Sequence, residues 1–352
     1  MITMILFGVF AILLLINLPI ALAIIFATLV TMLVTIDTLP ALTTIAQRLT
    51  AGIDSFALLA IPFFILSGYI MGQGGIALRL IEFAKVLVGR LPGGLAFVNV
   101  ISCALFGSIS GSAVAATSAI GGFMIPAMNK EGYNKPFSTA VTVTAATTGM
   151  LIPPSNILII YSLASGGVSI AALFIAGYLP GLLVTLLLIG AAAIYVKRKN
   201  IQPLSSNSIG PFWPSLFGAV PSLFLIFLII GGIIGGVFTP TEAGAIAVLY
   251  SLAVSLCFYK ELTFKDLYPI LLKSVNTTAI VMLLIGASSA MSWLMSYELI
   301  PQTISQTLLA LSDNPLMILL IINITLLLIG TFMDMTPAVL IFTPIFLPVA
   351  ES

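Results

Sequence analysis

Two apolar segments of this chain are interrupted by short runs of small, polar or helix-breaking residues. In the first run, positions 107–112, Ser108, Ser110 and Ser112 surround Gly111 in a stretch without charges. Serine hydroxyls and freed backbone carbonyls are hard oxygen donors that suit Na⁺, and an adjoining helix N-terminus suits a carboxylate. Close helix packing through small residues is the alternative interpretation. The run predicts a binding site for a cation and an anionic solute.

The second run contains Gly330, Thr331, Asp334 and Thr336. Asp334 is the only charged residue in 314–350. A carboxylate within an apolar membrane segment is a functional hypothesis by default, because its burial there is costly. It can serve as a cation ligand, as a neighbour of the substrate or as an acceptor for backbone amides. The two threonines add further oxygen donors.

A third break divides the apolar segment 137–165 near its middle, where Pro153 and Pro154 are adjacent. Proline has no N–H and clashes with the preceding turn, so carbonyls upstream lose their helical partners and become available to a cation. A simple kink is the alternative, but the polar pair that follows the prolines favours an unwound segment. The candidate binding residues there are Thr148, Gly149, Ile152, Pro154, Ser155 and Asn156.

The elements that position these breaks are membrane helices. Of 352 residues, 60% are hydrophobic and 7% are charged, whereas a soluble domain has about 25% charged residues. Repeated apolar segments of about 20 residues predict an all-α polytopic membrane protein rather than a barrel. The net charge of +1 gives no reason to expect nucleic acid as a partner. The absence of histidine excludes His-based metal sites and Ser-His catalysis, so we expect no enzyme and no cofactor besides Na⁺.

The basic residues orient the helices, because Lys and Arg are retained on the cytoplasmic side. With a cytoplasmic N-terminus and 4–36 as one membrane helix, eleven of the twelve basic residues fall inside, and Arg48 is the exception. The predicted crossings are 4–36, 55–72, 137–165, 170–196, 213–235, 243–259 and 274–293.

The other apolar segments, 91–129 and 314–350, are predicted to be re-entrant hairpins that enter and leave on one side. Their arms are short: as a helix, 91–106 reaches only about 24 Å of a hydrocarbon core of roughly 30 Å. Two complete spans in each segment would place the loops on the same sides and are the alternative. The amphipathic stretch 76–91 fits an interfacial arm or an ordinary connecting helix.

The two halves of the chain repeat at a constant offset. Pro92 precedes Gly107 by 15 residues and Pro315 precedes Gly330 by 15, so both pairs differ by 223 positions. In the predicted topology the two hairpins open to opposite sides, which makes an inverted repeat around a midplane site. The frequency of Gly and Pro in membrane helices is the alternative explanation. The predicted parts are scaffold helices and an arm at 1–90, a transport region at 91–196, a cytoplasmic linker at 197–212, second scaffold helices and arm at 213–313, and the second hairpin at 314–352.

At these residues the chain resembles the large, DctM-like membrane subunit of tripartite ATP-independent periplasmic (TRAP) transporters. The resemblance covers all 352 residues and rests on six motifs in order, each of them weak alone. It implies an elevator-type, Na⁺-coupled importer of organic acids, such as dicarboxylates or sugar acids, in a bacterial inner membrane. It implies as partners a small membrane subunit and a periplasmic substrate-binding protein. The six motifs occupy 61–68, 107–112, 121–128, 148–155, 238–243 and 330–337.

The resemblance also implies two sodium sites. Carried onto this chain, the second sodium site would use Gly330 and its neighbours. The repeat partner of 137–165 should begin near position 360, so we expect this chain to be a fragment whose second site is incomplete. Carried onto this chain, the first site would use Ser108, Ser110 and Ser112 with carbonyls around Gly149, Ile152 and Pro154.

Three other functions remain as alternatives. A Na⁺/dicarboxylate symporter that needs no binding protein would share the broken-helix architecture. An intramembrane hydrolase is disfavoured because one aspartate cannot form a carboxylate dyad and no histidine is present. A non-transporting membrane scaffold would show no dependence on sodium. No arginine cluster or other selective group identifies the organic acid.

Overall fold

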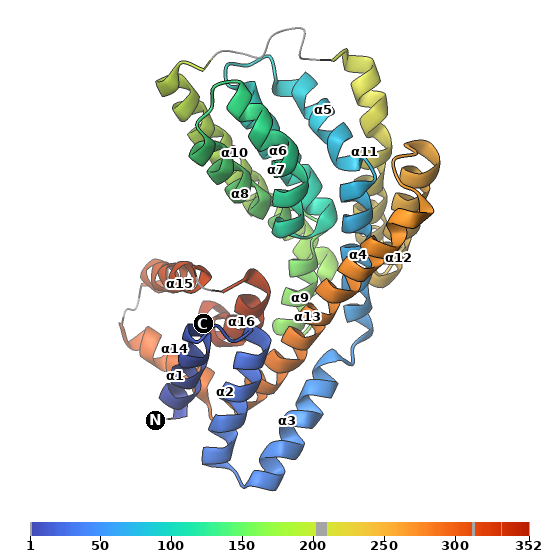
Figure 1. Ribbon diagram of the computed structural model, residues 1–352. Coiled ribbons are helices and arrows are strands. Elements are labelled where there is room, and N and C mark those ends of the chain that lie inside the picture. Colours follow the sequence, from blue (N-terminus) through green and yellow to red (C-terminus); the bar gives the residue numbers. More distant parts are fainter. Residues whose placement is uncertain (1, 202–209, 312–313, 332, 352) are drawn as a thin grey trace. The chain divides into compact units, whose positions relative to one another are not determined.

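The computed structural model describes residues 2–201, 210–311, 314–331 and 333–351, which form helices joined by turns and loops, with no strand among them (Figure 1). This confirms the all-α prediction. The helices fall into two compact units. Unit 1 comprises 1–58, 160–168 and 277–352, and unit 2 comprises 59–159 and 169–276.

Unit 2 contains the first predicted hairpin. Its helices are α4 (Ala60–Gln73), α5 (Ile76–Val88), α6 (Gly94–Ser110), α7 (Ala113–Lys130), α8 (Lys135–Leu151), α10 (Ile170–Lys199), α11 (Phe212–Ile234) and α12 (Pro240–Ala253). α6, α7 and α8 pack side by side, with α10 beside α8 (Figure 1). The amphipathic α5 packs against α6 and α11 and buries Ile76, Leu80 and Ala84. Residues 202–209 of the predicted linker 197–212 lie outside the described residues.

Unit 1 contains the two ends of the chain. Its helices are α1 (Ile2–Leu15), α2 (Ile20–Thr35), α3 (Thr38–Ile53), α14 (Ile300–Leu311), α15 (Pro315–Gly330) and α16 (Met335–Glu351). Two more helices, α9 (Asn156–Ala164) and α13 (Phe264–Tyr297), begin in unit 2 and end in unit 1.

The prediction of one membrane helix over 4–36 is wrong. The chain turns between α1 and α2, where Asn17 has a left-handed backbone with φ of 63° and Pro19 precedes α2. The two helices pack against each other and run in opposite directions (Figure 1). The error arises because both helices are apolar, so hydropathy alone merges them. α3 was not among the predicted crossings, and among the described residues it is likewise not one of the helices long and apolar enough to cross a membrane.

The predicted breaks are confirmed as helix ends. α6 and α7 meet at Gly111, α8 and α9 are separated by 152–155, and α15 and α16 by 331–334, of which position 332 lies outside the described residues. A helix that belongs to a candidate membrane span, a short amphipathic helix and two apolar helices occur in the same order twice, as α4–α7 and as α13–α16. The short helices begin at Ile76 and Ile300, and 300 minus 76 is 224, close to the offset of 223 between the prolines.

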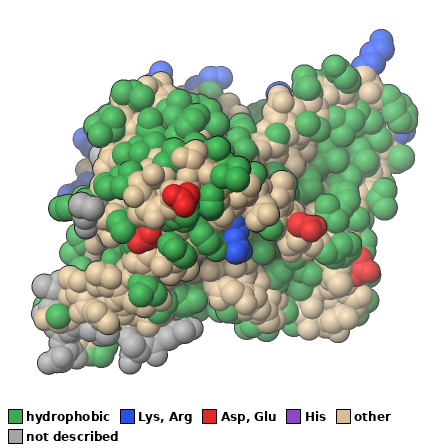
Figure 2. Space-filling model, turned by 90° about the horizontal axis from the view of Figure 1, so that it is seen from below, with side chains coloured by type: hydrophobic (Ala, Val, Ile, Leu, Met, Phe, Trp, Pro, Cys, Tyr) green, Lys and Arg blue, Asp and Glu red, His purple; other side chains and the backbone are tan. Residues whose placement is uncertain are grey.

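The lengths of the helices fit a multi-pass membrane protein. Among the described residues, five helical segments are long and apolar enough to cross a membrane, and α8 with α9 makes a sixth if this bent pair is one span. These six correspond to the predicted crossings other than 4–36. Large apolar side chains are exposed along them, such as Leu179, Leu183 and Leu186 of α10. Figure 2 shows one face of the molecule on which hydrophobic side chains are widespread and charged side chains are few. Such a surface is suited to lipid rather than water.

Candidate cation and substrate site

The first predicted break is a tight turn between α6 and α7. α6 continues through Ser110, so most of the predicted run is helical and only Gly111 and Ser112 leave the helix. Gly111 has a φ of 61°, a left-handed conformation that glycine adopts without steric cost. Ser112 then caps α7 by accepting a hydrogen bond from the amide of Ala115 at 3.2 Å. The tip therefore presents a capped helix N-terminus, whose dipole favours a nearby anion.

This tip lies directly against the end of α8. A Cβ atom on Gly149 would lie 2.3 Å from the Cα of Gly107 and 2.8 Å from the amide nitrogen of Ser108. A Cβ atom on Gly107 would lie 2.8 Å from the Cα of Gly149. All three distances are too short for a real side chain, so the two backbones meet only because both residues are glycine. The structure thus brings together two breaks that are distant in the sequence.

α8 ends at the predicted break because Pro153 and Pro154 cannot donate hydrogen bonds to carbonyls one turn earlier. The carbonyl of Gly149 therefore has no amide partner four residues ahead. The carbonyl of Met150 is in the same position and instead accepts a hydrogen bond from the hydroxyl of Ser155. A backbone oxygen without its helical partner is thus placed beside the first tip, as the sequence predicts.

Asn156 and Thr148 complete the predicted set around the tip. A Cβ atom on Gly111 would lie 2.7 Å from Nδ2 of Asn156, so this amide covers the turn. Asn156 is buried, and its Oδ1 has no hydrogen-bond partner among the described residues. Thr148 is fully buried, and its hydroxyl donates to the carbonyl of Ala145 at 2.6 Å. The unpartnered amide oxygen of Asn156 is a further candidate ligand.

Three more glycines allow neighbouring helices to approach the site, and the sequence reasoning missed them. A Cβ atom on Gly68 of α4 would lie 3.0 Å from the Cα of Ser110. On α10, a Cβ atom on Gly177 would lie 2.5 Å from the carbonyl oxygen of Leu151. One turn further, Gly181 packs against Ile152. Gly177 and Gly181 are four residues apart, a spacing typical of close helix pairs in membranes. That spacing is the signal that could have identified them.

The oxygen atoms at the tip suit a small, hard cation. The hydroxyl of Ser108 donates to a carbonyl of α6 at 2.8 Å, and that of Ser110 lies 3.5 Å and 3.4 Å from the carbonyls of Gly107 and Ser112. A hydroxyl that donates its proton keeps lone pairs that can face a cation. Hydroxyl and carbonyl oxygens are the type of ligand expected for Na⁺, and the roles of Ser108, Ser110 and Gly149 as ligands remain predictions. Within the described residues no group of three or more His, Cys, Asp or Glu could hold a metal ion.

The second tip, in unit 1, is less enclosed. Thr331 and Asp334 are exposed, whereas Thr336 is buried. The hydroxyl of Thr331 donates to the carbonyl of Leu328 at 2.7 Å. A Cβ atom on Gly330 would meet no described atom within 4 Å, so Gly330 is not held against an opposing backbone as Gly107 is. The roles of these residues as ligands remain predictions.

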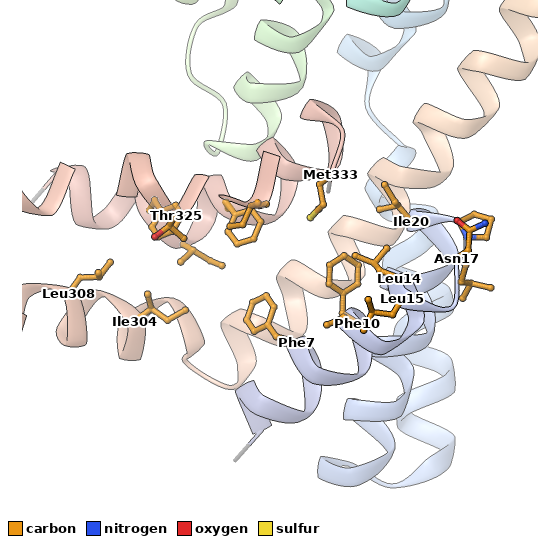
Figure 3. A pocket seen from close by; sticks show the side chains of 17 residues that line it. Phe7, Phe10, Leu14, Leu15, Asn17, Ile20, Ile304, Leu308, Thr325 and Met333 are labelled. Atoms are coloured by element: carbon orange, nitrogen blue, oxygen red, sulfur yellow. The ribbon is translucent and has the colours of Figure 1, made fainter. Parts of the chain in front are cut away.

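Unit 1 also contains an apolar cavity of about 1150 Å³. Figure 3 shows that Phe7 and Phe10 of α1, Thr325 of α15 and Met333 line it. A carboxylate in this cavity would lose its hydration and find almost no hydrogen-bond partner, which is costly. This apolar cavity is therefore a poor site for an organic anion.

Comparisons with known proteins agree on one family. Residues 7–352 match the family described as "Tripartite ATP-independent periplasmic transporter, DctM component". The "Uncharacterized protein YgiK" of Salmonella typhimurium is 53% identical, over 99% of this chain and 80% of that protein. The sialic acid TRAP transporter large permease protein SiaM of Vibrio cholerae is 38% identical, over 96% of this chain and 78% of its own length. The C4-dicarboxylate TRAP transporter large permease protein DctM of Rhodobacter capsulatus is 37% identical, over 99% and 81%.

Proposed function

The chain belongs to the family of DctM components of TRAP transporters, and from this membership we propose that it is the large permease subunit of a Na⁺-coupled, binding-protein-dependent importer of organic acids. It is a multi-pass membrane transport protein rather than an enzyme. Sialic acid and C4-dicarboxylates, which appear in the names of two relatives, are both organic anions. Their names support the class of solute but differ from each other, so they do not identify the acid.

The observation that carries the sodium proposal is the contact between the first tip and the end of α8. Gly107 and Gly149 meet backbone to backbone, and this contact supports a site that combines the hydroxyls of Ser108 and Ser110 with a carbonyl that lacks its helical partner. Hydroxyl and carbonyl oxygens are the ligands expected for Na⁺ in broken membrane helices. The N-terminus of α7 at the same tip would favour an anion near the bound cation.

Sodium should stabilise the purified protein against heat more than equal potassium or choline, and Ser110→Ala should weaken that effect. A ligand that binds only the folded state at 100 times its Kd adds about 2.7 kcal/mol, and a tenfold loss of affinity would reduce this to about 1.4 kcal/mol. The measurement is the thermal transition as a function of sodium concentration. Thr144→Ala is the matched control, because Thr144 is exposed on α8 and donates only to its own helix. Equal transitions in all three ions would contradict the proposal.

We propose that a small membrane subunit and a periplasmic substrate-binding protein work with this chain, as its family membership supports. Selection of the solute would then be shared with the binding protein. Transport would occur by movement of the part that carries the tips against a scaffold. The two broken tips, each between apolar helices of similar length, support such an alternating-access arrangement.

We also propose that the N-terminus lies in the periplasm, in place of the cytoplasmic position expected from one helix over 4–36. α1 and α2 run in opposite directions, and α3 is not among the candidate spans, so the first crossing is Phe56–Gln73. With Arg79 and Lys85 retained in the cytoplasm, the chain must start outside. A cysteine added at the N-terminus should react with a membrane-impermeant maleimide in intact spheroplasts, whereas Lys199→Cys should not. Protection of the N-terminal cysteine until the membrane is opened would contradict this topology.

A further inference from the structure

Unit 1 contains a second, polar cavity that the predicted sodium sites do not use. Its volume is about 550 Å³, which is within the range of small-molecule sites. It lies among the end of α3, the end of α9, α13 and α16. The side chains that carry the argument are Arg48, Asp54, Ser288, Ser289, Ser292 and Trp293, all of which line it.

Arg48 provides the positive charge of this cavity. It is the one basic residue that the charge-based topology leaves outside the cytoplasm. Its guanidinium carbon lies 5.5 Å from the ring centroid of Trp293, a cation–π contact that orients the head group. Within the described residues no carboxylate lies within 4.0 Å of Arg48, whereas Arg79 pairs with Glu261 at 3.2 Å. The charge of Arg48 is therefore available to an anion from outside the chain.

A row of serines on α13 faces the same cavity. Ser288, Ser292 and Ser296 are four residues apart, so they lie on one face of the helix. Ser288 is only 2% exposed, and its hydroxyl has no hydrogen-bond partner among the described residues. A buried hydroxyl without a partner is unfavourable and is rare in folded proteins. A ligand with polar groups would give Ser288 the partner that the protein does not.

The wall that carries Arg48 and the serines is closely packed. A Cβ atom on Gly52 of α3 would lie 2.4 Å from the Cβ of Ser289, and one on Gly286 of α13 would lie 2.8 Å from the carbonyl oxygen of Leu49. The two helix backbones thus touch directly beside the cavity. Such contacts hold the guanidinium and the hydroxyls in place before a ligand arrives, which lowers the entropy cost of binding.

Asp54, at the end of α3, defines which anions fit. A second carboxylate on the ligand would be repelled by Asp54, whereas a hydroxyl could donate a hydrogen bond to it. We propose that this cavity binds an organic acid with one carboxylate and several hydroxyls, the carboxylate on Arg48 and the hydroxyls on Ser288, Ser292 and Asp54. The inference rests on the proposed function, because it names the chemical class of solute that the importer accepts.

Trp293 provides a direct test, because the chain has two tryptophans and Trp213→Phe leaves Trp293 as the only one. The fluorescence of this single-tryptophan protein is titrated, without sodium, with the potassium salts of gluconate, succinate and acetate, and with the neutral polyol sorbitol. Gluconate should give a saturable change with an affinity at least tenfold above the other three. Calorimetry of gluconate binding on the same samples gives an affinity that does not depend on the contact between Arg48 and the ring.

Three substitutions complete the test. Arg48→Gln should lower the affinity for gluconate at least tenfold and Ser288→Ala three- to fivefold, whereas the control Arg198→Gln, at the end of α10, should leave it unchanged. Asp54→Asn should raise the affinity for succinate relative to gluconate at least fivefold. A flat gluconate titration, or one unchanged by Arg48→Gln, would overturn the inference. Retained sodium-dependent stabilisation in those samples would show that the proposed function survives that failure, and its loss that the sodium proposal failed as well.

Discussion

Gly149→Ala is expected to destabilise the protein and to abolish its sodium-dependent stabilisation, whereas Gly122→Ala is expected to do neither. A methyl group on Gly149 would lie 2.3 Å from the Cα of Gly107 and 2.5 Å from its carbonyl carbon, so the tip of the first hairpin must move away from α8. Overpacking of this kind costs about 1–3 kcal/mol. It also separates the serine hydroxyls from the carbonyl of Gly149, which removes the proposed sodium ligands from one another.

Gly122 is the matched control because a Cβ atom there would meet no described atom within 4 Å. It is exposed on α7, and replacing glycine by alanine inside a helix gains about 0.5–1 kcal/mol. The two substitutions add the same methyl group, so they should shift the thermal transition in opposite directions. Thermal transitions in sodium and in potassium measure both effects. A sodium response in Gly149→Ala equal to that of the unaltered protein would show that the close approach is not needed for the ion.

The double substitution Pro153→Ala, Pro154→Ala is expected to remove the response to sodium while leaving the protein folded. Proline is about 3 kcal/mol less favourable than alanine in a helix interior, so two such changes strongly favour continuation of α8 across the break. The restored amides would then bond to the carbonyls of Gly149 and Met150, and the hydroxyl of Ser155 would lose its acceptor. The carbonyl of Gly149 would no longer be available to a cation.

Pro180→Ala serves as the control for the loss of proline, because Pro180 lies within the uninterrupted helix α10. Circular dichroism should show slightly more helix in the double variant, and the thermal transition should no longer differ between sodium and potassium. Pro180→Ala should keep the difference. A normal sodium response in the double variant would mean that the unwound carbonyls are not ligands.

Several features of the fold are readable from the sequence because they depend on local chemistry. The all-α class follows from apolar segments of membrane length, and the helix ends at Gly111 and before Pro153 follow from residues that favour the end of a helix. The repeated order of helices was visible as the constant spacing of prolines and glycines. The wrong prediction of one helix over 4–36 also has a local cause. An unbroken apolar stretch concealed the turn at Asn17, although the nearby Pro19 was a usable signal.

In the candidate site, too, some features depend on local sequence and others on the packing of distant segments. The sequence predicts which residues offer oxygen atoms as ligands and where the helices break, because hydroxyls, glycines and prolines act on their own turn of helix. Three relations come from the packing of the helices: Gly107 meets Gly149, Gly330 has no neighbour within 4 Å among the described residues, and Arg48 lies over Trp293. Those relations depend on which helix surfaces pack together, and that is settled by the fit of side chains from segments far apart in the chain, a property that no local pattern contains.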